Sequence, residues 1–367
     1  MRSQVLLIAI VAAAAVEAAE PASIVRHLVV YREAGRFGGW PANHGIWAWG
    51  DEIVVGFELG YFAQRQTGHA IDYNRPAEHV LARSLDGGET WTLERPEGLR
   101  PPPGEKVAGV PTGAEGRQPV DCPGGIDFTH PDFALTARMT SIHAGNSRFY
   151  YSYDRGKSWQ GPFRLPNFGQ PGTAARTDYL VNGKHDCTLF LTAAKSNGRE
   201  GRVIAVRTRD GGKTWNFVSF IGPEPDDYAI MPSSVRLGPK HIFTAIRRRH
   251  WIDAWRSFDD GESWHFVGQP VVVTGGNPPC LTKLADGRIA LTYGFRQQPY
   301  GIRAKFSADG GQSWGEETIL RDDGGNWDLG YARTVQRRDG KLVTVYYFND
   351  SADTERYIAA TIWDPGR

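Results

Sequence analysis

The sequence has few cysteines, almost no net charge and no long hydrophobic run after its first residues. Its three cysteines, Cys122, Cys187 and Cys280, permit one disulfide at most, so a hydrophobic core must hold the fold. The net charge is +1 and acidic and basic residues are interspersed, which argues against a nucleic-acid partner. We find no motif for zinc, a nucleotide or a flavin and expect no cofactor, although a structural calcium ion stays open.

The first residues have the order of a secretory signal peptide. Arg2 precedes an apolar run over residues 5–16, and small residues follow it. The alternative, a membrane anchor, requires about 20 apolar residues. We therefore expect residues 1–19 to be a signal peptide and residues 20–367 to form a single domain. The mature chain is expected to be a secreted or periplasmic monomer with no membrane contact.

One octad of the form S/T-x-D-x-G-x-S/T-W is repeated along the chain. Its five copies occupy residues 84–91, 152–159, 208–215, 257–264 and 307–314. Each copy lies between two β-rich runs, which predicts a hairpin turn in which the Asp accepts backbone N–H groups and the Gly adopts a positive φ. The Trp is expected to pack between neighbouring sheets.

A second repeat predicts the inner hairpins of the same architecture. Strands rich in Val, Ile, Tyr and Phe flank turns at Asn182-Gly183, Asp286-Gly287 and Asp339-Gly340, and similar runs occupy residues 46–57, 133–139 and 235–246. Six units of roughly 50 residues have the size of propeller blades. We predict an all-β, six-bladed β-propeller of four-stranded antiparallel blades, with seven blades as the alternative. The strand over residues 24–31 is expected to complete the last blade.

The octads resemble the Asp boxes, or BNR repeats, of the sialidase superfamily, over essentially the whole mature chain. This resemblance implies an active site over the central axis, where the inner strands begin. Those beginnings lie near His44 and near residues 130–132, 176–179, 228–232, 277–279 and 331–333.

Sialidases clamp a carboxylate with three arginines and use a Tyr nucleophile, a Glu and an Asp acid/base. By resemblance, Tyr331 matches the nucleophile's segment and Arg296 the second arginine's segment. Arg36 and Arg303 are weaker matches to the first and third arginines. The chain departs from the pattern at Pro278, where the family usually has Glu, and over residues 58–64, which contain no Asp.

A histidine suggests a second type of chemistry. The segment over residues 38–45 resembles propeller lyases and rhamnosidases that act at uronic-acid linkages and depend on a central histidine. His44 would be the base, and Arg176 or Arg333 would neutralise the carboxylate beside the abstracted proton. The alternative is a histidine that satisfies a buried turn.

Further candidates follow from alternation along the strands. Arg176 and Asp178 are expected to share one face, as are Tyr331 and Arg333, with a structural ion pair as the alternative for the first pair. Tyr179 adjoins this segment and is a candidate substrate contact. His69 and His130 lie in predicted loops that can face the same opening. The basic run Arg247-Arg248-Arg249 is either a solvated strand end or an anion-binding rim.

These features together predict an exported enzyme that cleaves a glycosidic bond in an acidic glycan. The expected partner is an oligo- or polysaccharide that contains uronate or sialate. A sialidase-like hydrolase, a polysaccharide lyase with a histidine base and a non-catalytic glycan-binding propeller all stay open. Convergence of His44 and two arginines on one pocket would favour an enzyme over a binding protein.

Overall fold

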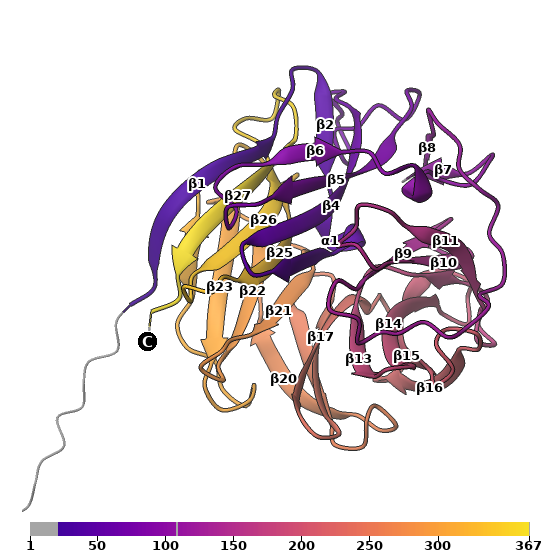
Figure 1. The fold of residues 1–367 in the computed structure, drawn as a ribbon. Coiled ribbons are helices and arrows are strands. Elements are labelled where there is room, and N and C mark those ends of the chain that lie inside the picture. Colours follow the sequence, from indigo (N-terminus) through magenta and orange to yellow (C-terminus); the bar gives the residue numbers. More distant parts are fainter. Residues whose placement is uncertain (1–20, 108, 367) are drawn as a thin grey trace, which may run out of the picture.

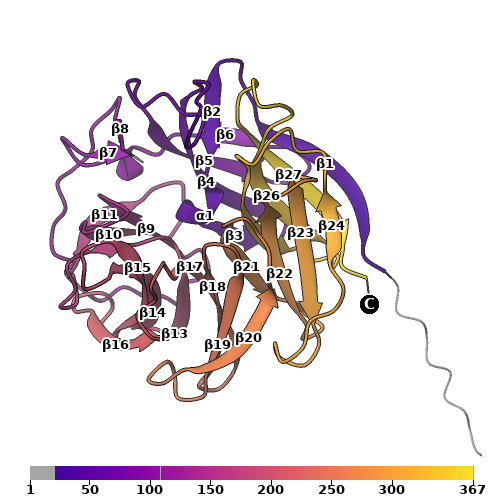
Figure 2. The same ribbon diagram turned by 180° about the vertical axis from the view of Figure 1, so that it is seen from behind.

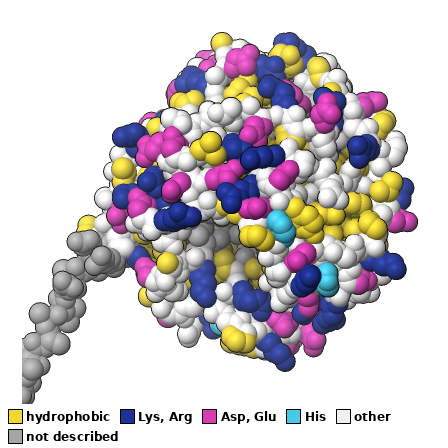
Figure 3. All heavy atoms as spheres, in the orientation of Figure 1, with side chains coloured by type: hydrophobic (Ala, Val, Ile, Leu, Met, Phe, Trp, Pro, Cys, Tyr) yellow, Lys and Arg dark blue, Asp and Glu magenta, His cyan; other side chains and the backbone are white. Residues whose placement is uncertain are grey.

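The computed structural model describes residues 21–107 and 109–366. Six antiparallel sheets surround a central axis, and the four-residue helix α1 (Pro41–His44) lies near the centre of the ring (Figures 1 and 2). This arrangement confirms the predicted six-bladed β-propeller. Basic and acidic side chains are interspersed over the face that Figure 3 shows. The predicted signal peptide lies outside the described residues. Among those residues, no helix has the length and apolar character that crossing a membrane requires.

The blades follow one another along the chain. The first blade has β2 (Arg36–Gly39) and β3 (Ile46–Trp49), both paired with β4 (Glu52–Tyr61), then β5 (Glu78–Ser84) and β6 (Thr92–Glu94). Within the described residues, the second has three strands instead of the predicted four: β9 (Ala134–Met139), β10 (Ser147–Ser152) and β11 (Gln160–Leu165). The third has β12 (Thr173–Ala174) and β13 (Tyr179–Gly183), both paired with β14 (Asp186–Ala194), then β15 (Glu200–Thr208) and β16 (Asn216–Ile221).

The remaining blades are four-stranded. The fourth has β17 (Ile230–Gly238), β18 (His241–Arg247), β19 (Ile252–Ser257) and β20 (His265–Val271). The fifth has β21 (Pro279–Lys283), β22 (Ile289–Phe295), β23 (Gly301–Ser307) and β24 (Thr318–Arg321). The sixth has β25 (Gly330–Gln336), β26 (Leu342–Phe348), β27 (Tyr357–Asp364) and β1 (Ser23–Tyr31). The link between the first two blades contains a 3-10 helix, η1 (Glu97–Leu99), and the small hairpin of β7 (Lys106–Val107) and β8 (Val110–Pro111).

The first strand of the chain closes the ring. β1 pairs antiparallel with β27, with Ile24 opposite Trp363 and Leu28 opposite Ala360. Figure 1 shows indigo β1 lying beside yellow β27. The sixth blade thus takes its outer strand from the opposite end of the chain, as predicted. Such closure leaves no gap in the ring at which another chain can pair.

Each octad forms the turn between the last two strands of a blade. In the second blade, Asp154 accepts the Ser158 N–H at 2.9 Å and the Ser158 hydroxyl at 2.5 Å. Gly156, with φ of 80°, donates its N–H to Ser152 Oγ at 2.8 Å. The Asp of every other copy accepts the same two groups. These bonds join residues at most four positions apart, so they are local to each octad.

Aromatic side chains that follow the turns pack against the preceding blade, as the sequence predicts. The ring pairs and their centroid distances are Trp159 with Trp47 at 5.7 Å, Trp215 with Phe149 at 5.6 Å, Trp264 with Phe190 at 6.2 Å and Trp314 with Phe243 at 6.2 Å. Trp363 does the same for the sixth blade, at 5.7 Å from Phe306, although no octad precedes it. The three cysteines are buried and unpaired, so within the described residues no disulfide joins the blades.

We predict that Asp154→Ala destabilises the protein by about 1–3 kcal/mol, because two donors of Ser158 lose their acceptor. Urea unfolding followed by tryptophan fluorescence measures this change. Asp121→Ala is the matched control, since Asp121 forms an ion pair with Arg164 but its side chain is 91% exposed. Equal unfolding midpoints for the two variants would contradict this role of the turn.

Candidate functional site

A cavity of about 560 Å³ lies where the inner strands begin. Most of its lining comes from the first, second, third, fourth and sixth blades, and Lys106 and Gly109 come from the link between the first two. The lining residues are Trp40, Asn43, Glu58, His69, Tyr73, His79, Lys106, Gly109, Ala137, Arg138, Met139, Thr140, Ser141, Ile142, Ala175, Arg176, Glu200, Tyr228, Ile230, Arg247 and Tyr331. The predicted location of the site, over the central axis, therefore coincides with a real cavity.

Backbone irregularities at three strand beginnings shape this cavity. Trp40, Met231 and Tyr331 have positive φ angles of 57°, 50° and 54°. Helix α1 follows Trp40, and the pairings of β17 and β25 are shifted at Met231 and Tyr331. Left-handed backbone is costly for these residue types and is concentrated at functional sites.

Tyr331 is the best placed candidate nucleophile in the cavity. Its side chain is 8% exposed, and its Oη accepts a hydrogen bond from Arg247 Nη1 at 3.0 Å. The Arg296 guanidinium carbon lies 5.4 Å from the centre of the Tyr331 ring. Burial alone would raise the pKa of Tyr331, but the charges of Arg247, Arg296 and Arg176 outweigh it and lower the pKa below its usual value.

Asn277 holds the Tyr331 backbone in its unusual conformation. The Tyr331 N–H donates to Asn277 Oδ1 at 2.9 Å, and Asn277 Nδ2 donates to the Leu329 carbonyl at 3.2 Å. Asn277 is fully buried and belongs to the fifth blade. A side chain of the fifth blade thus fixes the backbone of Tyr331 in the sixth.

His69 lines the cavity and has a carboxylate partner. Its Nδ1 lies 2.6 Å from Asp328 Oδ1, and the imidazole is 24% exposed. Asp328 Oδ2 accepts further bonds from Arg356 Nε at 3.0 Å and from the Ala70 N–H at 2.9 Å. The His69 ring centre lies 6.4 Å from that of Tyr331. The second ring nitrogen is not part of the Asp328 contact, which suits a group that transfers protons.

Positive charge dominates the rest of the cavity lining. Arg138, Arg176, Arg247 and Lys106 face two carboxyl groups, those of Glu58 and Glu200. Arg176 Nη1 lies 2.7 Å from Glu200 Oε1, and its Nε donates to Asn43 Oδ1 at 3.1 Å. Burial lowers the pKa of Arg138 to about 10, so Arg138 keeps its charge at neutral pH. Such a lining suits an anionic ligand.

His44 lies outside the cavity lining. It is fully buried at the end of α1, with Nε2 3.5 Å from Glu58 Oε1 and its ring 5.0 Å from that of His79. Burial keeps the pKa of His44 well below its usual value, and Arg138 lowers it further. Burial also raises the pKa of Glu58 to about 8.

The expected alternation along two strands is wrong. Tyr331 and Arg176 line the first cavity, whereas Arg333 and Asp178 line a second cavity of about 350 Å³ further along the inner strands, which Tyr179 also lines. The shifted pairing of β25 separates Tyr331 from Arg333, and β13 begins only at Tyr179. Side-chain alternation therefore does not apply to either pair.

The residues of the second cavity are engaged with the protein itself. Arg333 Nη2 donates to the carbonyls of Ala42 at 2.6 Å and Thr177 at 2.9 Å. Asp178 accepts the N–H and the hydroxyl of Ser234, and burial raises its pKa to about 7. Tyr179 accepts a bond from Trp47 Nε1 at 3.2 Å.

The structure does not bring four other candidates into the first cavity. Arg36 donates to the Gly60 carbonyl at 2.9 Å and stacks on Tyr61. Arg303 donates to the Arg321 carbonyl at 2.6 Å, and His130 accepts the Asp132 N–H at 3.2 Å. Arg296 lies behind Tyr331 and donates to Tyr347 Oη at 2.8 Å.

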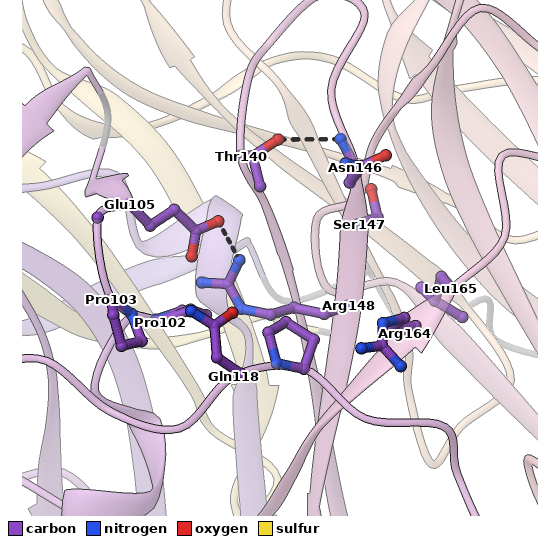
Figure 4. A pocket seen from close by; sticks show the side chains of 12 residues that line it. Pro102, Pro103, Glu105, Gln118, Thr140, Asn146, Ser147, Arg148, Arg164 and Leu165 are labelled. Carbon is purple, nitrogen blue, oxygen red and sulfur yellow. Dashed lines mark hydrogen bonds and ion pairs between the residues drawn. The ribbon is translucent and has the colours of Figure 1, made fainter.

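A third cavity, of about 400 Å³, lies beside the second blade (Figure 4). Arg148 and Glu105 form an ion pair there, and Arg148 Nε also donates to Tyr150 Oη at 2.8 Å. Arg164 pairs with Asp121 at 2.9 Å. Because each of these charges has a partner, we place the functional site at the central cavity.

The sequence reasoning did not single out several lining residues as site residues, namely Arg247, Glu200, Glu58, His79 and Arg138. Only Arg247 carried a signal, because it belongs to the basic run. Its neighbours do not share its role, since Arg248 pairs with Asp253 at 2.5 Å and Arg249 with Asp227 at 3.6 Å.

The fold and the Asp-box turns define a sialidase-like, glycoside hydrolase-like propeller. Residues 133–344 match the model of the BNR repeat-like domain, and the chain belongs to this family. A protein described as a sialidase, from Bacteroides fragilis (strain YCH46), is 24% identical over 314 residues, which cover 80% of this chain. The chain spans 46% of that relative's length.

Solved structures share the fold. A protein of unknown function from Dyadobacter fermentans has a TM-score of 0.72 at 21% identity, with 94% of this chain and 99% of that chain covered. A mutant Trypanosoma rangeli sialidase that displays trans-sialidase activity has a TM-score of 0.58 at 13% identity, with 95% and 58% covered. A mutant NanB sialidase from Streptococcus pneumoniae has a TM-score of 0.58 at 12% identity, with 92% and 70% covered. At these identities the likeness establishes the fold alone.

We predict that Arg247→Gln raises the pKa of Tyr331, because the variant loses the cation that donates to its oxygen. Ultraviolet titration of tyrosinate absorbance measures this change, and Tyr331→Phe assigns the signal. The wild type should show one tyrosine that ionises before the others, and both variants should lack it. An unchanged titration curve in Arg247→Gln would refute this electrostatic role.

Proposed function

We propose that this protein is an exported glycoside hydrolase that removes an acidic sugar from a glycan, with Tyr331 as nucleophile and His69 as acid/base. The observation that carries the proposal is the convergence of Tyr331, Arg247 and His69 on one cationic cavity. The sialidase described in Bacteroides fragilis supports the same reaction class.

The chemistry begins at Tyr331. Its oxygen attacks the anomeric carbon while the bond from that carbon to the leaving oxygen breaks, and His69 donates a proton to the leaving oxygen. We assign Glu200 to receive the phenol proton, because it lines the cavity and its charge acts on Arg247. In the second step His69 takes a proton from a water molecule whose oxygen attacks the anomeric carbon while the bond to the Tyr331 oxygen breaks. Glu200 returns its proton to the phenolate, and the anomeric configuration is retained.

A tyrosine nucleophile favours a sugar whose carboxylate is attached to the anomeric carbon. A neutral phenol is not repelled by that carboxylate, whereas an Asp or Glu nucleophile would be. Arg176 and Arg247 are the lining cations that we expect to hold the carboxylate. Sialate is therefore the first substrate to test, and uronate is the second.

The histidine-base lyase is less well supported. His44 is fully buried and does not line the cavity, so a substrate proton would not reach it without rearrangement of α1. His69 lines the cavity and its imidazole is 24% exposed, and its carboxylate partner suits reversible proton transfer.

We predict that His69→Gln lowers kcat on a natural oligosaccharide by about 100- to 10,000-fold but has a much smaller effect on an aryl glycoside. The aryl leaving group is stable as an anion and does not need the proton. Released sugar and released phenol are measured in parallel, with His130→Gln as the control that keeps wild-type rates. Equal losses on both substrates would exclude His69 as the acid.

A trapping experiment tests the nucleophile. We expect a fluorinated acidic glycoside to label the peptide that contains Tyr331, as seen by mass spectrometry, and Tyr331→Phe to remain unlabelled. Labelling of another residue, or absorbance of an unsaturated uronate in place of hydrolysis, would refute the proposed mechanism.

The dependence of kcat/KM on pH should follow the protonation of His69. Burial lowers the pKa of His69, the Asp328 carboxylate raises it, and the pKa stays below its usual value. Because the acid form is lost as pH rises through this pKa, kcat/KM should be highest at acidic pH. Asp328→Asn removes the carboxylate that raises the pKa of His69, so the decline of kcat/KM should begin at a lower pH. A purely structural role for Asp328 would not shift this decline.

A further inference from the structure

A cluster of three potential metal ligands lies beside the cavity in the first blade. Glu58 of β4 and His79 of β5 are directly opposite each other on neighbouring strands, so their side chains leave the same face of the sheet. His44 lies over them, with Nε2 3.5 Å from Glu58 Oε1. One ligand atom from each residue lies within 4.8 Å of those from the other two.

The fold keeps space for His44 against this sheet. Gly56 precedes Glu58 by two residues and therefore shares its face. A Cβ at position 56 would lie 2.6 Å from His44 Cβ, so any other residue would displace the imidazole. The placement of all three side chains is thus built into the blade.

The ligand atoms lack hydrogen-bond partners within the described part of the chain. These atoms are Nδ1 and Nε2 of His44, Oε2 of Glu58 and Nδ1 of His79. His44 is fully buried and Glu58 is 4% exposed. Buried polar groups are nearly always paired, because unpaired groups destabilise the fold. A bound ion would satisfy several of these atoms at once.

We propose that His44, Glu58 and His79 bind one divalent ion of the zinc type. Two imidazoles and one carboxylate are a ligand set that zinc accepts with an open fourth position. Ligand atoms of tetrahedral zinc lie about 3.3 Å apart. Side-chain movements of about 1 Å would bring the three ligand atoms to this spacing. Glu58 and His79 line the cavity, which places the fourth position toward it.

The guanidinium of Arg138 also lines the cavity, and its charge opposes a cation there. Glu58 compensates part of this charge, and an anion at the open position would compensate more. The site is therefore suited to an ion that binds together with an acidic ligand. This proposal does not rest on the proposed hydrolase activity, because binding is measured without a substrate.

The test uses the full mature chain after dialysis against a chelator. Zn²⁺ is titrated calorimetrically, and Co²⁺ by visible absorbance, because tetrahedral Co²⁺ absorbs much more strongly than octahedral Co²⁺. We expect one equivalent of each ion, strong visible bands and a rise in Tm. Absence of binding, or a weak octahedral spectrum, would overturn the proposal.

Two variants locate the site. Glu58→Gln and His79→Gln should each weaken Zn²⁺ binding by at least about 100-fold. His265→Gln, which removes an exposed imidazole of β20, is the control and should bind as the wild type does. Wild-type affinity in both ligand variants would place the ion elsewhere and overturn the assignment. If circular dichroism shows that a variant is unfolded, the other variant and the wild-type Co²⁺ spectrum decide.

Discussion

The cavity depends on breaks in the inner strands at the point where they reach the central axis. A regular strand directs alternate side chains to the two faces of its blade. Left-handed backbone at Trp40, Met231 and Tyr331 accompanies these breaks, at about 1–3 kcal/mol for each residue. Neighbouring blades stabilise this geometry, because Asn277 accepts the Tyr331 N–H and Thr192 Oγ1 accepts the Met231 N–H at 3.1 Å. The rigid ring therefore holds a strained site that an isolated blade would not maintain.

The difference between bonds within one turn and contacts between blades explains what the sequence could and could not predict. The Asp-box bonds join residues at most four positions apart, so the turns, the blade count and the ring closure were predictable. The site combines the end of β18, the start of β15 and a loop after β4, and only the closed ring places these segments together. The alternation that grouped Tyr331 with Arg333 failed because the bulge depends on Asn277, which is 54 residues away from Tyr331.

In the proposed mechanism, Arg247 would link the activation of Tyr331 to the recognition of the substrate. In the free protein it donates to Tyr331 and helps to lower the pKa of the phenol. A carboxylate that binds Arg247 would neutralise this charge and raise the same pKa again. Arg296 does not line the cavity but lies against Tyr331, so its effect on the phenol would persist when substrate is bound. Arg247 can therefore serve substrate binding while Arg296 continues to lower the pKa of Tyr331.

The two central histidines suit different tasks because their surroundings differ. His69 is partly exposed and has one carboxylate that orients it, as proton transfer requires. His44 is enclosed, and neither ring nitrogen has a hydrogen-bond partner among the residues that the structure describes. It lies against a carboxyl group and a second imidazole. An ion bound there would add positive charge beside a cavity that already contains four cations. The proposed metal site and the proposed preference for an acidic sugar therefore reinforce each other, although separate residues carry them.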